Sequence, residues 1–282
     1  MTSPGAALPT GLAGVVLAAG EGRRLKPLTD LRPKPLCPVG HSTGLADALG
    51  RFAAIGLSGP GAVAVNAHHH AGQLAAAVGD GVHLSVEAPE ALGTAGAIGA
   101  LRPWLDGRAV VVANGDAYLA GDDPVGRLLV GWSGERPRLL VVRDPGRADF
   151  GDLRFAGVSL LPAATAARLR PEPTGLYEAV WRDAYRAGEL ELLVFDGTFV
   201  DCGTVRDYLD ANLHRSGGAS VVGAGAVVDG TLTRSVVWPG GRVARGEHLV
   251  DAVRTDTGRT VTGPPGQSIP TGQGPSGRCL SG

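Results

Sequence analysis

The sequence predicts an α/β protein with a Rossmann-like α/β/α sandwich over residues 12–215 and a short left-handed β-helix over residues 216–255. Three observations support this prediction. Short apolar runs alternate with segments of helical spacing through the larger part. The first run, residues 15–17, leads directly into a glycine-containing loop. Beyond Gly218, aliphatic residues recur six positions apart between glycines, which is typical of β-helix coils.

The expected elements follow in order along the chain. Apolar runs predict strands at residues 15–17, 62–66, 82–86, 108–113, 138–143, 190–194 and 198–200. Helical spacing predicts helices at residues 45–54, 71–78, 96–101, 172–186 and 205–214. The run 108–113 is continuously apolar, which favours a central place in a parallel sheet. Asp196-Gly197 predicts a hairpin turn between the last two strands.

The C-terminal part has a different character. Val222 and Val228 are six residues apart, as are Val237, Val243 and Leu249. About two coils of β-helix would fit, too few to stand alone, so they should pack on the larger domain or on another subunit. The β-helix could therefore support a homo-oligomer. Residues 256–282 are rich in glycine, proline and serine, which predicts a disordered tail.

Composition excludes several classes of protein. The 282 residues carry a formal net charge of −1, which gives no electrostatic reason to expect nucleic-acid or anionic-membrane binding. No apolar run approaches the roughly 20 residues needed to span a bilayer, and no signal peptide is visible. Cys37, Cys202 and Cys279 are widely spaced without a C-x-x-C motif, so neither a disulfide framework nor a zinc site is indicated. We expect a reduced, cytoplasmic protein.

The stretch VVLAAGEGRRLKPLTDLRPKPLCPV, residues 15–39, has the composition of a polyphosphate site. Small residues allow the backbone to approach a ligand, and the arginines and lysines that follow could neutralise phosphate charge. A mobile loop with solvated arginines is the alternative. The P-loop pattern and the dinucleotide fingerprint are both missing from the stretch.

Two acidic positions suit a metal ion. Asp116 follows the strand 108–113, and ligands of open α/β sheets bind beyond the carboxyl ends of strands. Its carboxylate suits Mg²⁺, although Asp116 could also be a simple turn residue. Asp201, in D-C-G-T, could be a second ligand or merely the cap of the next helix.

Several motifs together resemble the sugar nucleotidyltransferases, also called NDP-sugar pyrophosphorylases. The stretch L-A-A-G-x-G-x-R-L-x-P-L-T followed by P-K-P-L resembles their signature, with Arg23 replacing the usual Ser or Thr. The motifs N-G-D, F-A-G-V and D-x-G-T follow in family order. L-G-T-A-G-A, residues 92–97, is similar to the mannose-1-phosphate guanylyltransferase and N-acetylmuramate-1-phosphate uridylyltransferase branches.

The resemblance implies a fold of the nucleotide-diphospho-sugar transferase type and Mg²⁺-dependent transfer of a nucleotidyl group from an NTP to a sugar 1-phosphate. It places Arg24, Lys34 and Asp116 in catalysis and Asp116 and Asp201 on the metal. It places Asn114 and Gly157 at the sugar. Glu178 could also hydrogen-bond sugar hydroxyls, or it could be a solvated carboxylate on a helix. The implied nucleotide-binding residues are Leu17, Ala18, Ala19, Gly20, Glu21, Gly22, Arg23, Glu87, Gly93, Thr94 and Gly115.

Other features leave alternatives open. The thymidylyl branch holds the sugar phosphate with a lysine that this chain lacks, and Arg143, Arg147 or Arg154 could substitute. The histidines at 68–70 are expected to shape the crevice wall rather than bind metal. Glu87 could accept hydrogen bonds from guanine or from uracil, so the base is undecided.

The motif at 92–97 and the β-helix favour mannose-1-phosphate guanylyltransferase. The alternatives are a uridylyltransferase acting on a hexose or N-acetylmuramate 1-phosphate, and a regulatory homologue that binds a sugar nucleotide without making it. A glycosyltransferase would ordinarily carry D-x-D, which Asp116-Ala117-Tyr118 lacks.

Overall fold

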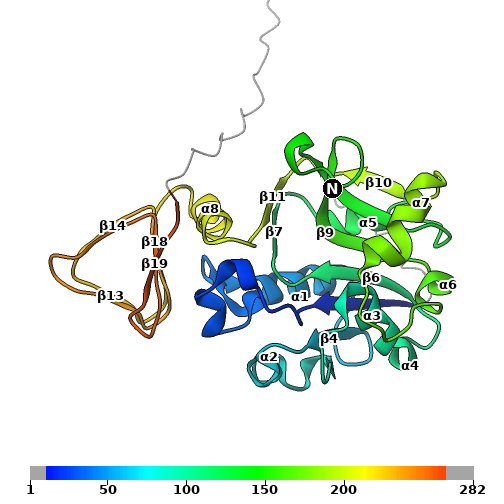
Figure 1. Ribbon diagram of the computed structural model, residues 1–282, viewed down its shortest axis with the longest axis horizontal. Coiled ribbons are helices and arrows are strands. Elements are labelled where there is room, and N and C mark those ends of the chain that lie inside the picture. Colours follow the sequence, from blue (N-terminus) through cyan, green and yellow to red (C-terminus); the bar gives the residue numbers. More distant parts are fainter. Residues whose placement is uncertain (1–10, 265–282) are drawn as a thin grey trace, which may run out of the picture.

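A seven-stranded mixed sheet forms the centre of the molecule in the computed structural model, which describes residues 11–264 (Figure 1). The strand order is β10-β8-β9-β6-β1-β4-β5. The bounds are β1 Leu12–Leu17, β4 Val63–Ala67, β5 His83–Val86, β6 Ala109–Asn114, β8 Arg138–Arg143, β9 Leu153–Leu161 and β10 Glu191–Val194. β6 is central, as predicted, but only its β1 side is parallel, because β9 runs antiparallel to both β6 and β8.

Helices cover both faces of this sheet, so the α/β/α sandwich is confirmed. Val16 faces an apolar cluster that includes side chains of α1, α2 and α5, whereas its neighbour Val15 faces one that includes α3, α4 and α6. The helices are α1 Gly44–Ala54, α2 Ala71–Val78, α3 Gly93–Ala100, α4 Arg102–Leu105, α5 Pro124–Leu129, α6 Ala163–Ala166, α7 Arg182–Arg186 and α8 Val205–Arg215. A π-helical turn, Tyr177–Trp181, precedes α7.

The predicted hairpin at Asp196-Gly197 is wrong. β10 pairs with β8 in the main sheet, whereas β11, Thr198–Asp201, pairs antiparallel with β7, Ala117–Ala120, in a separate two-stranded sheet. Residues 195–197 therefore carry the chain from one sheet to another. β7 follows Asp116 directly and was not predicted, and its pairing with β11 brings Asp201 opposite Ala117.

The loop between β1 and α1 has no long element of its own. It contains three-residue 3₁₀ turns at Arg23–Leu25, Leu28–Asp30 and Lys34–Leu36, followed by the short antiparallel pair β2, Pro38–Val39, and β3, Ser42–Thr43. Thr43 caps α1 by accepting a hydrogen bond from the backbone N–H of Ala46. Two further 3₁₀ turns lie at Gly79–Gly81 and Pro145–Arg147.

Residues 221–262 form what we call the C-terminal coil, which Figure 1 shows as a triangular outline beside α8. Three parallel ladders run along it: β12-β15-β18, β13-β16 and β14-β17. Val237, Val243 and Leu249, from the predicted six-residue recurrence, are buried together inside it. The strands are β12 Val221–Val222, β13 Val227–Val228, β14 Thr231–Thr233, β15 Val236–Val237, β16 Arg242–Val243, β17 His248–Val250, β18 Ala252–Arg254 and β19 Thr260–Thr262.

The predicted disordered tail begins too early. Within it, β19 pairs antiparallel with β18, because Val261 lies opposite Val253 and continues that ladder. Residues 265–282 of the predicted tail, with Cys279, lie outside the described residues. Over residues 11–264, no helix combines the length and apolar character needed to cross a bilayer.

Candidate active site

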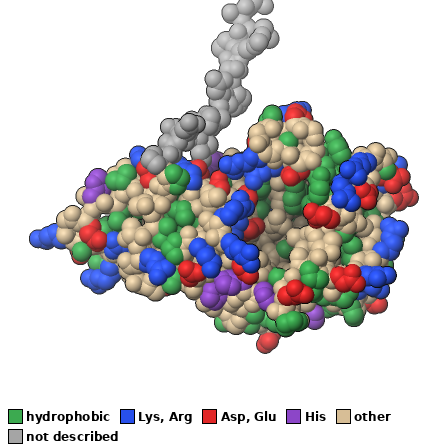
Figure 2. Space-filling view, in the orientation of Figure 1, with side chains coloured by type: hydrophobic (Ala, Val, Ile, Leu, Met, Phe, Trp, Pro, Cys, Tyr) green, Lys and Arg blue, Asp and Glu red, His purple; other side chains and the backbone are tan. Residues whose placement is uncertain are grey.

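Two adjoining hollows open where β1 and β6 end, and three predicted catalytic residues belong to both. One hollow, of about 290 Å³, is lined by the glycine loop, and the other, of about 390 Å³, reaches β9 and the π-helical turn. Arg24, Lys34 and Asp116 line both. Lys and Arg side chains gather at the edge of a hollow near the middle of the face shown in Figure 2. The geometry offers two compartments that share one charged wall.

Lys34 lies at the centre of this wall. Its Nζ is 2.6 Å from Asp116 Oδ2 and 3.2 Å from Asp201 Oδ1, and its side chain is only 8% exposed. Burial alone would lower the pKa of Lys34, but the two carboxylates outweigh it and the pKa is raised. The structure thus brings two acids from distant segments onto one ammonium group.

Two arginines contact the other oxygen of Asp201. Arg154 Nη2 lies 3.3 Å and Arg24 Nη2 lies 3.6 Å from Asp201 Oδ2. Burial would raise the pKa of Asp201, but Lys34, Arg154 and Arg24 together lower it. Asp201 therefore stays ionised among three cations and holds them in one cleft.

Arg154 is the only one of the three candidate substitutes for the missing lysine that lines the larger hollow. Its guanidinium also lies 3.4 Å from Asp144 and 5.2 Å from the ring centroid of Phe199. Arg143 is 70% exposed and pairs with the exposed Asp152, and Arg147 pairs with Asp207. The structure separates three residues that the sequence could not rank.

The glycine loop forms the floor of the smaller hollow. Leu17, Ala18, Gly20, Gly22 and Arg23 line it. Gly22 has φ +60°, where a Cβ would lie 2.8 Å from Thr29 Cγ2, whereas a Cβ at Gly20 would meet nothing within 4 Å. Glu21 pairs with Arg23 at 2.5 Å, and Ala19 is buried. Gly115 lies beneath the loop and donates to Leu17 O.

Glu87 occupies a different place from the expected contact with a base. It is 4% exposed, and its two oxygens accept hydrogen bonds from Asn66 Nδ2 and from Leu92 N, each at 2.7 Å. Asn66 Oδ1 in turn accepts from Ala18 N at 2.6 Å. The carboxylate thus joins the glycine loop to the loop before α3. Asn66 was not predicted to belong to the site. The signal that could have identified it is a polar amide at the end of an otherwise apolar strand.

Gly93 and Thr94 contact the segment 170–176. Ala95 N donates to Thr174 O at 2.9 Å, and Thr94 Oγ1 accepts from Leu176 N at 2.7 Å. Along α3, an added Cβ would lie 2.7 Å from Thr174 O at Gly93, 2.3 Å from Glu172 O at Gly96 and 2.2 Å from Arg170 O at Gly99. The glycines let the segment lie directly on the helix.

The larger hollow holds two of the three residues predicted to bind sugar. Asn114 and Gly157 line it, whereas Glu178 is exposed and folds back towards Gly175. Sequence reasoning missed the aromatic wall, which is formed by Phe150, Phe155, Tyr177, Trp181 and Phe199. Trp181 Nε1 is buried without a hydrogen-bond partner among the described residues. The faces of aromatic rings suit a sugar.

The three consecutive histidines contact backbone carbonyls. His69 Nε2 and His70 Nε2 lie 3.0 and 3.2 Å from Thr29 O, and His68 Nδ1 lies 3.0 Å from Glu87 O. His69 and His70 thereby fasten the loop that carries Arg24 and Lys34 to the start of α2. The three histidines are not among the residues that line the two hollows, so their place in the crevice wall stays a prediction.

The paired carboxylates fit Mg²⁺. The ion usually takes one or two protein carboxylates and completes its octahedron with phosphate oxygens and water. Asp116 and Asp201 already face one cation, the Lys34 ammonium. Within residues 11–264 there is no cluster of three or more His, Cys, Asp or Glu side chains arranged for a metal, so the substrates would have to supply the remaining ligands.

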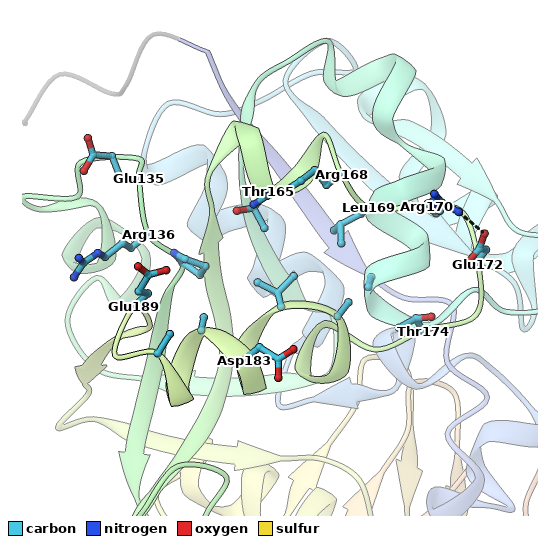
Figure 3. Close-up of a pocket in the computed structure, with 16 residues that line it drawn as sticks. Glu135, Arg136, Thr165, Arg168, Leu169, Arg170, Glu172, Thr174, Asp183 and Glu189 are labelled. Atoms are coloured by element: carbon cyan, nitrogen blue, oxygen red, sulfur yellow. Dashed lines mark ion pairs between the residues drawn. The ribbon is translucent and has the colours of Figure 1, made fainter.

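A further groove, of about 570 Å³, lies on the other side of the π-helical turn (Figure 3). Ala179, Val180 and Asp183 line this groove, whereas Tyr177 and Trp181 line the larger hollow. Its charges are mixed, with three arginines facing four carboxylates, and Arg170 lies 3.9 Å from Glu172. None of the predicted site residues lines it.

Comparisons with known proteins find related nucleotidyltransferases. A family model described as MobA-like NTP transferase domain matches residues 14–222. N-acetylmuramate alpha-1-phosphate uridylyltransferase of Neisseria meningitidis serogroup B is 35% identical over 111 residues, 37% of this chain and 47% of that enzyme. Glucose-1-phosphate thymidylyltransferase of Streptomyces antibioticus is 27% identical over 238 residues, 71% of this chain and 65% of that enzyme. The matched stretches therefore span about half to two thirds of these relatives.

Solved structures establish the fold. A Thermus thermophilus structure described as mannose-1-phosphate geranyltransferase has a TM-score of 0.65 at 19% identity and covers 89% of this chain and 94% of that chain. A putative glucose-1-phosphate thymidylyltransferase from Bacillus anthracis, in complex with a sucrose, has a TM-score of 0.62 at 20% identity and covers 72% and 94%.

Proposed function

Since this chain belongs to the family of MobA-like NTP transferase domains, we propose that it transfers a nucleotidyl group from an NTP to a sugar 1-phosphate. The products are an NDP-sugar and pyrophosphate. The observation that carries the proposal is Lys34, which bridges Asp116 and Asp201 at the wall shared by two hollows. A reaction that joins two phosphorylated substrates needs such a shared wall.

The chain's own residues position the substrates and neutralise their charge. The glycine loop receives the NTP phosphates through backbone N–H groups, and the aromatic hollow receives the sugar. An oxygen of the sugar phosphate attacks the α-phosphorus in line, the bond to the bridging oxygen of the β-phosphate breaks, and pyrophosphate leaves with that electron pair. Arg24 neutralises the leaving group, and Lys34 contacts phosphates of both reactants.

Asp116 and Asp201 would hold Mg²⁺, which would polarise the α-phosphate and offset the charge of the approaching phosphate. Arg154 supplies the cation that the family's lysine supplies elsewhere. Arg154 contacts Asp201 through Nη2 and Asp144 through Nη1, and the remaining N–H groups of its guanidinium would donate to the sugar phosphate.

For the substrates, we propose GTP and mannose 1-phosphate, on the L-G-T-A-G-A motif and on the C-terminal coil, which we take to be the expected left-handed β-helix. UTP with N-acetylmuramate 1-phosphate is the second candidate, because the Neisseria relative carries that activity in its name.

The buried free thiols of Cys37 and Cys202 fit a reducing, cytoplasmic location. A homo-oligomer through the coil remains a prediction.

The test is a matrix of five NTPs against several sugar 1-phosphates with Mg²⁺, read as pyrophosphate release and NDP-sugar formation. We expect one pair to dominate and Lys34→Ala and Asp116→Ala each to lose at least about 100-fold in turnover while remaining folded. Arg143→Ala is the matched control, since Arg143 pairs with Asp152 on the surface. Sugar-nucleotide binding without turnover would support the regulatory alternative and overturn the proposal.

A further inference from the structure

We propose that Trp238 of the C-terminal coil is a positioning residue for residues 23–39, which we call the catalytic loop. Through this loop the coil influences kcat, although it contributes no described lining residue to the site. The inference rests on the proposed roles of Arg24 and Lys34. None of the described residues of the coil lines either hollow. Its effect must therefore pass through the loop.

A chain of hydrogen bonds leads from the coil to the loop. Trp238 is fully buried, and its Nε1 donates to Tyr208 OH at 3.0 Å. Tyr208 OH donates to the carbonyl oxygen of Pro38, to which Asn212 Nδ2 also donates, at 3.3 Å. Burial raises the pKa of Tyr208 well above its usual value, so its hydroxyl keeps the proton that it donates.

A second connection lies nearer to Lys34. The guanidinium carbon of Arg32 is 4.1 Å from the centroid of the Trp238 ring, within the range of a cation–π contact. Arg32 Nη2 also lies 2.9 Å from Asp256 Oδ2 of the segment that follows β18. The coil thus holds Arg32 from two directions.

The coil also completes the apolar core beneath the loop. Leu25, Leu28, Cys37 and Val39 of the loop pack in one cluster with Cys202. Val221, Val236, Trp238 and Val253 are the coil members of that cluster. Leu25 adjoins Arg24, and Cys202 adjoins Asp201, so the cluster touches the backbone next to two charged residues of the site.

The loop needs this external support because its own structure is weak. It consists of 3₁₀ turns of three residues, and such short turns contribute few cooperative hydrogen bonds. Catalysis by positioning is sensitive to small displacements, and a shift of about 1 Å can cost on the order of 100-fold in rate. The contact at Trp238 is therefore a determinant of kcat.

The test compares Trp238→Phe, Tyr208→Phe and the double variant in the full chain. Trp238→Phe removes Nε1 and keeps an apolar ring, and Tyr208→Phe removes the hydroxyl. We expect each to lower kcat about tenfold with smaller changes in KM, and the double variant to be no slower than either single variant, because both interrupt one path. Hydrogen exchange of peptides within residues 23–37 should become faster.

Arg234→Ala is the control, because Arg234 pairs with Asp251 inside the coil and does not contact the loop. It should leave kcat and loop exchange unchanged. A lowered Tm in the Trp238 and Tyr208 variants with unaltered loop exchange would overturn the inference. Hydrogen exchange of the loop needs no substrate, so it tests the inference independently of activity. If no pair of NTP and sugar phosphate were turned over, only the proposed function would be contradicted.

Discussion

At the scale of single residues, the site depends on the balance of charge around Asp201. Three cations, Lys34, Arg154 and Arg24, lie against this one carboxylate. Because like charges repel strongly where water is scarce, each cation tolerates the others only while Asp201 is ionised. The three cations that would contact phosphate oxygens are therefore held together by Asp201.

Asp201→Asn should therefore destabilise the fold by about 2 kcal/mol at pH 7. The folded-state pKa of Asp201 is lowered, so its contribution is present above the unfolded-state pKa of about 3.9 and is lost as the pH falls through the folded value. The pKa of Lys34 is raised, so its contribution is lost only as the pH rises beyond about 10.4. Urea unfolding from pH 2 to 7 should show the wild type and the variant converging in acid.

The control for that measurement is Asp152→Asn, because Asp152 forms an exposed pair with Arg143. Exposed pairs contribute about 0–1 kcal/mol, so this change should be nearly silent. A stability difference between wild type and Asp201→Asn that persists unchanged at pH 2 would contradict the charge argument.

Arg154→Ala should raise the KM for the sugar phosphate about 10- to 100-fold and change the KM for the NTP much less, because Arg154 lines only the larger of the two hollows. Arg154→Lys should restore part of the loss, since it keeps the charge but not the fork of donors. Steady-state kinetics with each substrate varied in turn would check this. An equal rise for both substrates would argue against a separate sugar-phosphate role.

At the scale of secondary-structure elements, α3 shows a glycine pattern with a packing function. Gly93, Gly96 and Gly99 face the backbone of residues 170–174, where any larger side chain would collide with a carbonyl group. That segment continues into the turn that carries Tyr177 and Trp181. The loop before α3 and the aromatic wall are therefore parts of one closely packed unit.

Gly96→Ala and Gly50→Ala form a matched pair that tests this packing. Both glycines lie inside helices, so alanine gains about 0.5–1 kcal/mol of helix propensity at either position. A Cβ at Gly50 would meet nothing within 4 Å, whereas at Gly96 it would lie 2.3 Å from Glu172 O. We expect Gly50→Ala to raise Tm. Gly96→Ala should lower Tm, because it should reduce the free energy of unfolding by about 1–3 kcal/mol. Equal effects of the two changes would contradict the packing role.

The sequence was most informative where local chemistry decides the structure. The helix predicted at residues 45–54 appears as α1, and the strands that lead into the glycine loop and into Asn114-Gly115-Asp116 appear as expected. It was least informative where distant segments meet. No local sequence feature indicates that β11 pairs with β7 rather than with β10. Nor does any indicate that both oxygens of Glu87 accept hydrogen bonds from Asn66 and Leu92. The aromatic wall likewise gathers residues from 150 to 199, which no spacing rule connects.

At the scale of the whole molecule, the coil and the catalytic domain share one core. Tyr208, Leu209 and Ala211 of α8 pack in one cluster with residues of the loop and of the coil. Burying a large apolar side chain contributes about 1.5–3 kcal/mol, so the four coil residues in this cluster account for several kcal/mol of stability. The catalytic domain is therefore not expected to be stable in isolation.

A chain ending at residue 218 should consequently unfold at a lower temperature and bind a hydrophobic dye such as ANS, because the apolar face of α8 would be exposed. Trp238→Ala in the full chain should also be destabilising, with a free energy of unfolding lower by about 3–5 kcal/mol. Differential scanning calorimetry and ANS fluorescence would check both. A truncated chain with the wild-type Tm would show that the domains are energetically independent.

The reversed direction of β19 has a further consequence. A stack of parallel coils can lengthen indefinitely, since each new rung repeats the direction of the last, and an uncovered final rung invites a copy of the same chain to continue it. Beside β18 that place is taken by a strand running the opposite way. End-to-end addition of another copy is therefore blocked at the β18 edge of this ladder.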